Sequence, residues 1–164
     1  MVETIIEIPS GLDVEIGNDS FTVSGPKGKV SYKYRDVSIS KDSGKIKISG
    51  QSKALVNTTQ ALMKSAFKGV TEGYTIKLQM VYAHFPFTIE QKGSEILIKN
   101  FLGEKSPRKA KIVGDTKMKV EKEFIILTGP DKYAVGQTAA NLKSATYIKE
   151  KDPRVFQDGI YDPL

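Results

Sequence analysis

The sequence predicts an α+β protein of two tandem duplicated domains, each an antiparallel β-sheet packed with one α-helix. The segment VNTTQALMKSA at residues 56–66 recurs as VGQTAANLKSA at residues 135–145, at a constant offset of 79 residues (135 minus 56). The stretches before both copies alternate apolar and polar residues with period two, which is typical of strands with one buried face. A length of 164 residues fits two small domains, each of which would be marginally stable alone.

The first copy is expected to open with short strands separated by turn residues. These strands are LDVEI, FTVSG, KVSYKY, VSIS and KIKISG, at residues 12–16, 21–25, 29–34, 37–40 and 45–50. An antiparallel meander is their simplest assembly. A helix follows, for which Asn57 is the expected N-cap, with Gln60 three residues later and with Gly69 and Gly73 at its end.

The second copy repeats this order. Residues 74–87 (YTIKLQMVYAHFPF) are expected to form one long strand leading into it, with Pro86 at the junction. Residues 87–104 match the opening hairpin at an offset of 75, which places Glu90 on Glu15 and Gly103 on Gly28. The offset between the two copies rises from 75 residues at the hairpin to 79 at the helix. This rise indicates an insertion of four residues in a loop of the second copy, most simply located in GEKSPRKAK at 103–111. Residues 116–129 supply two further strands before the second helix.

These assignments predict three regions. They are an N-terminal repeat at 1–82, a C-terminal repeat at 83–148, and an extended C-terminal tail at 149–164. Two Asp-Pro pairs in the tail discourage helix at the residue before each proline.

Composition excludes several classes of site. The chain has no cysteine, which excludes disulfides and cysteine-ligated metals and suits a reducing cytoplasm. The N-terminal MVETIIEIPSG has neither a basic start nor a long apolar run, so we expect no signal peptide and no membrane span. His84 is the single histidine and is best explained as a packed or interfacial residue. We therefore predict no catalytic, metal or cofactor site.

The strongest positive charge lies in the second half of a chain whose net charge is +6. A basic window faces only Asp115 and Glu121 and consists of Lys105, Arg108, Lys109, Lys111, Lys117, Lys119 and Lys122. Further cations alternate with rings at Lys143, Tyr147, Lys149, Lys151, Arg154, Phe156 and Tyr161. Cations neutralise phosphates and rings stack on unpaired bases, so this mixture favours RNA, although a charge run can also be only a solvated face.

Two glycine-containing segments each leave two interpretations open. The second helix has small side chains at Gly136, Ala139, Ala140, Ser144 and Ala145, which suit either tight packing on the sheet or close approach of a partner. Glycine inside a helix costs about 1 kcal/mol relative to alanine, so one of these must compensate. SGPKGKV at residues 24–30 is best explained as a tight turn, with phosphate contact by Lys27 and Lys29 as a secondary role.

Six segments in order resemble a known family over essentially the whole chain. They are VSGPKGKV (23–30), GVTEGY (69–74), VYAHFPF (81–87), IKNFLGEK (98–105), VGQTAANLKSAT (135–146) and FQDGIY (156–161). The chain resembles the large-subunit ribosomal protein L-six family in its archaeal or eukaryotic-like branch. The resemblance implies a non-enzymatic protein of the cytoplasmic ribosome, bound to large-subunit rRNA near the sarcin-ricin loop, the factor-binding region and the stalk base. It also implies that the C-terminal repeat makes the main RNA contacts, that other ribosomal proteins and translation factors lie nearby, and that the protein has no cofactor, membrane or small-molecule substrate.

The resemblance and the charge pattern together define the expected rRNA-binding residues. They are Lys105, Arg108, Lys109, Lys111, Gly136, Gln137, Ala140, Asn141, Lys143, Tyr147, Lys149, Lys151, Arg154, Phe156 and Tyr161, with Lys27, Lys29 and His84 as secondary RNA or protein contacts. Bacterial relatives end in a glycine- and lysine-rich tail, whereas this chain carries Asp158 and Asp162, so the phosphate role of that tail is not transferred. A protein-interaction adaptor with a non-specific basic face is the alternative, and a carboxylate-based hydrolase or transferase has no support in the sequence.

Overall fold

The computed structural model describes residues 1–163 and divides the chain into two compact units. The first comprises Met1–Gly73 with Pro130–Lys132, and the second comprises Tyr74–Gly129 and the chain from Tyr133 onward. The sequence places the boundary at residue 82, whereas here it follows Gly73, because the strand at Tyr74–Val81 pairs along its length with the strand at Phe124–Gly129. Within the described residues, no helix has the length and apolar character needed to cross a membrane.

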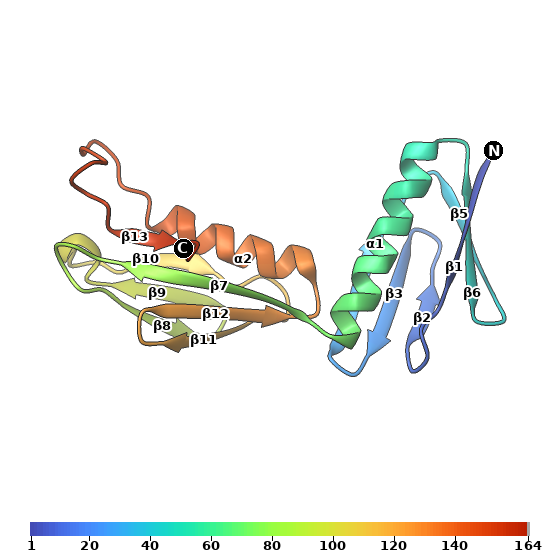
Figure 1. Cartoon of the computed structure of the whole chain (residues 1–164), viewed down its shortest axis with the longest axis horizontal. Helices are drawn as coiled ribbons and strands as arrows, with labels where there is room; N and C mark the ends of the chain where they lie inside the picture. The colour runs from blue at the N-terminus through green and yellow to red at the C-terminus, as the bar shows by residue number, and fades with distance from the viewer. Residues whose placement is uncertain (164) are drawn as a thin grey trace. The chain divides into compact units, whose positions relative to one another are not determined.

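The first unit contains two antiparallel sheets of three strands each, in place of the single meander expected (Figure 1). Its elements are β1 (Val2–Glu7), β2 (Asp13–Ile16), β3 (Ser20–Gly25), β4 (Gly28–Lys33), β5 (Val37–Asp42), β6 (Lys45–Gly50) and α1 (Lys53–Thr71). The strand orders are β1-β6-β5 and β2-β3-β4. The meander is divided because β4 and β5 do not pair with each other. In addition β1, which the sequence did not predict as a strand, pairs antiparallel with β6 over its whole length.

Helix α1 begins one turn earlier than expected. Lys53 is its first residue and Ser52 its N-cap, so Asn57 is not the cap but an exposed residue inside the helix. The buried stripe of the helix starts at Val56 and continues through Met63 and Phe67, and this burial extends the helix past the favourable capping position. At the other end Gly73, with a φ of 81°, follows the helix as expected, whereas Gly69 lies inside it.

The second unit has the same α+β composition. Its elements are β7 (Tyr74–Val81), β8 (Thr88–Lys92), β9 (Glu95–Lys99), the 3-10 turn η1 (Phe101–Gly103), β10 (Arg108–Lys111), β11 (Lys117–Glu121), β12 (Phe124–Gly129), α2 (Lys132–Ala145) and β13 (Gly159–Tyr161). Two antiparallel sheets have the strand orders β11-β12-β7-β13 and β10-β9-β8. The expected long strand at 74–87 therefore ends at Val81, and the expected extended tail contributes a strand, β13, that pairs with β7.

The strand pairing of the two units follows the predicted repeat. The order β5-β6-β1 corresponds to β11-β12-β7, and β6 and β12 begin at Lys45 and Phe124, which are 79 residues apart. Val23 pairs with Val30 in the first unit, and Ile98 pairs with Arg108 in the second. These separations of seven and ten residues place three of the four extra residues between β9 and β10, inside the expected region.

One face of α2 packs into the core of its unit and the other faces outward. Val135, Ala139 and Leu142 are buried against a core that includes Leu78, Ile96, Ile98, Phe101, Ile125 and Leu127. Gln137 and Ala140, together with Ser144, are exposed. The small side chains of α2 therefore divide between the two interpretations, since Ala139 packs inward and Ala140 points to solvent.

Candidate nucleic-acid interface

The outward face of α2 leaves room for a partner at Gly136. A Cβ atom built on this glycine would meet nothing within 4 Å, and its φ does not lie in the left-handed region. No packing or backbone requirement within the described chain explains glycine here, although it costs the helix about 1 kcal/mol relative to alanine. The free space over Gly136 is therefore available to an external molecule.

Two amide side chains tie α2 to β10. The Gln137 amide nitrogen donates to the Asn141 side-chain oxygen at 2.9 Å, and the Asn141 amide nitrogen donates to the Lys111 carbonyl at 3.0 Å. These bonds fix the lateral distance between the helix and the strand. They also hold the polar edge of α2 beside the lysines of β10.

A groove of about 460 Å³ lies between β10 and α2. Its lining consists of Glu95, Lys109, Ala110, Lys111, Asn141, Ser144 and Ala145. Ala110 is buried, so the period of two along the strand exposes Lys109 and Lys111 on either side of it. The groove therefore combines two exposed lysines and the carboxylate of Glu95 with a surface of small and amide side chains.

A second groove, of about 600 Å³, lies beyond the C-terminal end of α2. It is lined by Leu102, Glu104, Arg108, Ser144, Ala145, Tyr147, Ile148, Lys149 and Lys151. Ser144 and Ala145 line both grooves, which therefore adjoin. The Tyr147 side chain is 66% exposed at its edge. We call the two grooves, together with the outward face of α2 from Gly136 to Ser144, the α2 surface.

Arg108 stands apart from the other cations because its guanidinium is used inside the protein. It donates to both carboxylate oxygens of Glu104, at 3.0 and 2.7 Å, and to the carbonyls of Ala145 and Tyr147, at 3.0 and 2.9 Å. Its charge also lies 4.6 Å from the centre of the Phe101 ring. Ala145 is the last residue of α2 and Tyr147 lies two residues beyond it, where a cation compensates unpaired oxygens and the negative end of the helix dipole.

The Glu104 carboxylate responds to this arrangement. The hydrogen bond from Arg108 lowers the pKa of Glu104 below its usual range, against partial burial, which acts in the opposite direction. The carboxylate therefore stays charged at neutral pH. Charge in the basic window is thus partly neutralised from within, and Lys109 and Lys111 remain its outward-facing cations on β10.

The segment after α2 folds back onto the sheet. The Asp158 side chain is fully buried and accepts hydrogen bonds from His84 Nδ1 at 2.8 Å and from the backbone amides of Ala83 and His84 at 3.2 and 3.3 Å. The His84 ring stacks on Phe156, with ring centres 4.8 Å apart. Phe156 is therefore packed within the protein and does not present a free face as Tyr147 does.

The remaining predicted residues are dispersed. Lys143 pairs with Asp162 at 2.7 Å, and Arg154 pairs with Asp152 at 3.1 Å. Lys105 is exposed in the loop before β10, and Tyr161 is exposed on β13. Lys27 and Lys29 are exposed at the turn between β3 and β4 and belong to the first unit.

Glu104 and Asp158 were not predicted as site residues. Glu104 lies four residues before Arg108, a spacing at which opposite charges often pair, but only within a helix, and the segment is not helical. Asp158 is 74 residues from His84, and no local pattern connects the two. Only the folded chain reveals their roles.

The buried carboxylate of Asp158 makes the free energy of unfolding depend on pH in the acid range. Burial would raise the pKa of Asp158, but the hydrogen bonds from the His84 side chain and from the two backbone amides lower it below its ordinary value. A carboxyl group whose pKa is lower in the folded state stabilises the fold above its unfolded pKa and loses that contribution as pH falls through the folded pKa. We expect the stability advantage of wild type over Asp158→Asn to shrink as the pH falls below about 4.

Urea unfolding of both proteins at matched ionic strength measures this advantage. Taking the difference removes the contribution of the other carboxylates, including Glu104. A difference that stays constant down to pH 3 contradicts the assignment of the charged form.

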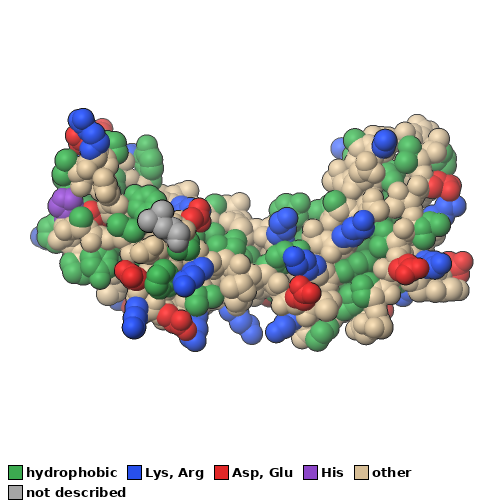
Figure 2. Space-filling view, in the orientation of Figure 1, with side chains coloured by type: hydrophobic (Ala, Val, Ile, Leu, Met, Phe, Trp, Pro, Cys, Tyr) green, Lys and Arg blue, Asp and Glu red, His purple; other side chains and the backbone are tan. Residues whose placement is uncertain are grey.

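On the face seen in Figure 2, the basic side chains do not form one continuous patch. In Figure 2, the visible face of each unit shows lysines and arginines among acidic and apolar side chains. The α2 surface therefore offers its shape and a few placed cations in addition to the net charge of the chain. Among residues 1–163, no group of three or more His, Cys, Asp or Glu side chains is arranged to hold a metal ion.

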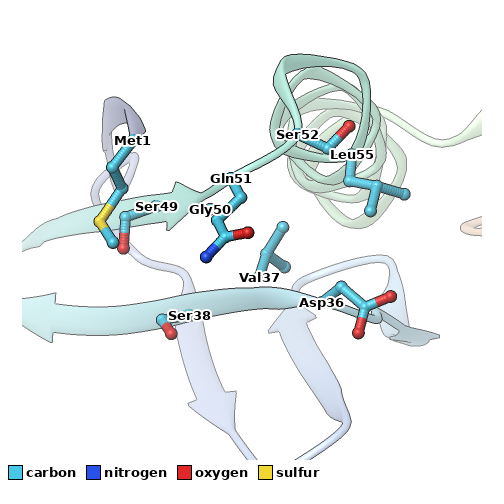
Figure 3. Close-up of a pocket in the computed structure, with 9 residues that line it drawn as sticks. All are labelled: Met1, Asp36, Val37, Ser38, Ser49, Gly50, Gln51, Ser52 and Leu55. Carbon is cyan, nitrogen blue, oxygen red and sulfur yellow. The ribbon is translucent and has the colours of Figure 1, made fainter.

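A depression in the first unit is a different kind of feature (Figure 3). It has a volume of about 640 Å³ and is lined by Met1, Asp36, Val37, Ser38, Ser49, Gly50, Gln51, Ser52 and Leu55. Asp36 is the one ionisable side chain among these, and it lies 3.5 Å from Arg35. None of the residues predicted to bind RNA lines it.

Comparisons with known proteins extend over the whole chain. The family model described as ribosomal protein L6 matches residues 87–159. The large ribosomal subunit protein uL6 of Methanosarcina mazei is 45% identical over 163 residues, which cover 95% of this chain and 93% of that protein. Proteins of the same name from Methanothrix thermoacetophila and Archaeoglobus fulgidus are each 43% identical over 171 residues, covering 98% and 97% of this chain and 97% and 87% of theirs.

Proposed function

The chain belongs to the ribosomal protein L6 family, and from this premise we propose that its α2 surface binds large-subunit rRNA near the sarcin-ricin loop, the factor-binding region and the stalk base. As a member of this family it is a structural, non-enzymatic protein of the large ribosomal subunit, located in the cytoplasmic ribosome. Its partners are rRNA and other ribosomal proteins, and we propose that translation factors bind close by. The second unit makes the main RNA contacts in this proposal.

The observation that carries the proposal is the open space over Gly136. An RNA backbone can approach the helix closely only where no side chain projects, and Gly136 and Ala140 provide such a strip on the outward face of α2. The intrinsic cost of glycine in a helix is then offset by binding and not by folding. The exposed amide of Gln137 adds a hydrogen-bonding group beside this strip.

The charges on either side of the strip suit a phosphate backbone. Lys109 and Lys111 project from β10 at one groove, and Lys149 lines the other. Each ammonium that contacts a phosphate releases a condensed counterion, which makes binding salt-dependent. Tyr147 supplies an exposed ring on which an unpaired base can stack.

The test of this proposal compares two RNAs of equal length. One is a large-subunit fragment that contains the sarcin-ricin region, and the other is a scrambled sequence. We expect at least tenfold tighter binding of the first, or about 1.4 kcal/mol, with affinity that falls steeply as salt is raised. Equal affinity for both RNAs contradicts specific rRNA recognition by the isolated protein and favours a protein-interaction adaptor with a generic basic face.

Replacing both Lys109 and Lys111 with alanine is expected to weaken binding to the specific fragment by about three- to tenfold and to reduce the slope of log affinity against log salt by up to about 2. The reason is the loss of two phosphate contacts. Filter binding or fluorescence anisotropy at several salt concentrations measures both quantities. Replacing Lys45 and Lys47 of the first unit is the matched control, because these exposed lysines also flank a buried residue on a strand.

The control variant is expected to bind like wild type. An unchanged salt slope in the Lys109 and Lys111 variant would exclude these lysines from the RNA interface. The fold is expected to remain intact in both variants, since the ammonium groups are exposed.

A further inference from the structure

Asp158 stands at the start of a chain of contacts that reaches the α2 surface. Its side chain is fully buried, whereas that of His84 is 32% exposed. One carboxylate oxygen lies 2.8 Å from His84 Nδ1, and the other accepts the amides of Ala83 and His84. Side-chain and backbone bonds together hold the histidine in one place and orient its ring.

The contacts continue from His84 to a lysine of the second groove. The His84 ring stacks on Phe156 at an interplanar angle of 16°, and Lys151 Nζ lies 4.9 Å from the centre of the Phe156 ring. Lys151 is also one of the residues that line the groove beside Tyr147 and Lys149. A buried carboxylate is thus connected through two rings to an exposed cation of the proposed RNA surface.

The segment that carries Lys151 is held at both ends. Before it, the Tyr147 carbonyl accepts a hydrogen bond from Arg108, and after it β13 pairs with β7. Between these points, the backbone amides of Val155 and Phe156 both donate to the carbonyl of Asp152, which closes a local turn. The segment therefore has a defined conformation although it contains no helix or strand of its own.

We propose that Asp158 is a positioning residue for RNA binding, which acts through His84 and Phe156 to hold Lys151 at the rim of the groove, where its ammonium group meets a phosphate. This inference rests on the proposed function, since it assigns Lys151 to the same RNA interface. Lysine side chains lose much rotamer freedom on binding, and a cation already resting on a ring loses less. Asp158 thus contributes to affinity without touching the RNA.

A double-mutant cycle with the full chain and the sarcin-ricin fragment tests the proposal. We expect Lys151→Ala and Asp158→Ala each to weaken binding by about three- to fivefold, and the double variant to bind no more weakly than either one. Such non-additivity is the signature of two residues that act through one contact. Asp158→Asn is the conservative control and should bind within twofold of wild type, because its amide oxygen can accept from the two backbone amides and its amide nitrogen can donate to His84 Nδ1.

Two further measurements keep the cycle decisive. His84→Ala removes the stacked ring at a partly exposed residue. It should weaken binding by the same three- to fivefold, and it replaces Asp158→Ala in the cycle if that variant folds poorly. Amide hydrogen exchange of residues 148–157 should become faster in Asp158→Ala and His84→Ala and stay unchanged in Lys151→Ala.

Each contrary outcome has a separate meaning. In one outcome the affinity losses of the two single variants multiply in the double variant, while the wild-type protein still prefers the specific fragment to the scrambled RNA. This outcome overturns the positioning role of Asp158 and leaves the proposed function standing. If Lys151→Ala binds the specific fragment like wild type, the inference alone is overturned, because Lys151, at the end of the contacts from Asp158, would then not touch the RNA. Equal affinity of the wild-type protein for the specific fragment and the scrambled RNA overturns the proposed function and this inference with it.

Discussion

Replacing Arg108 with alanine is expected to lower the free energy of unfolding by about 3 kcal/mol, a large effect for a side chain in a basic window. The guanidinium makes four hydrogen bonds and lies against the Phe101 ring, and its side chain is only 24% exposed. Removing it leaves the carbonyls of Ala145 and Tyr147 without this donor and leaves the Glu104 carboxylate without its partner. The loss therefore includes the cost of leaving partly buried polar groups unpaired.

Urea or thermal unfolding of the purified variant measures this effect. Lys109→Ala is the matched control, because the neighbouring side chain is exposed on the same strand and is expected to change stability by less than about 0.5 kcal/mol. Arg108→Lys should recover little, since one ammonium group cannot replace the planar fork that bonds both a carboxylate and two carbonyls.

The alternative for Arg108 is a direct RNA contact of the kind proposed for Lys109. In that case Arg108→Ala would unfold like wild type and bind RNA more weakly, with a reduced salt slope. A stability loss below about 1 kcal/mol would contradict the structural role. Measuring unfolding and binding on the same preparation separates the two roles.

Replacing Gly136 with leucine is expected to weaken binding to the specific rRNA fragment by at least tenfold while the fold remains as stable or becomes more stable. A leucine side chain would fill the space above the helix that we assign to RNA. Within the protein it meets no obstruction, and leucine favours the helix over glycine by somewhat under 1 kcal/mol. Opposite signs for stability and for binding distinguish a partner surface from packing against the sheet.

The internal repeat supplies the control for this variant. Asn57 occupies the position of Gly136 in the first copy, 79 residues earlier, and is exposed on its helix, where Gly136 is half-buried. Asn57→Leu should therefore leave RNA affinity unchanged. Gly136→Leu with wild-type affinity would show that the space over α2 is not occupied by RNA, and reduced stability would show that the glycine is required for folding.

Local patterns in the sequence were sufficient for most of the fold. Period-two alternation identified the strands from β2 to β6, and the repeated helical segment identified both helices and their relation. These features depend on contacts between residues close in the chain or on a repeated pattern, so they can be read without coordinates. The strand β1 was missed, and its pairing with β6 requires residues 38 to 48 positions apart to meet.

For the candidate site, residue type and order determined only part of the result. The sequence by itself determined the family resemblance, the basic window of the second half and the small residues of α2, because each is a property of composition or spacing. The tertiary structure decided which of those residues face outward. It placed Ala139 in the core and left Gly136 open, and it engaged Arg108 with the end of α2 while leaving Lys109 exposed.

The pairing of His84 with Asp158 shows the physical reason for this division. A buried carboxylate is stable only when donors surround it, and here those donors come from a segment 74 residues away in sequence. The sequence determined only which residue types stand at positions 84, 151, 156 and 158. Only the folding of the last strand onto β7 decided that they form one connected set of contacts, since burial and distance are properties of the assembled chain.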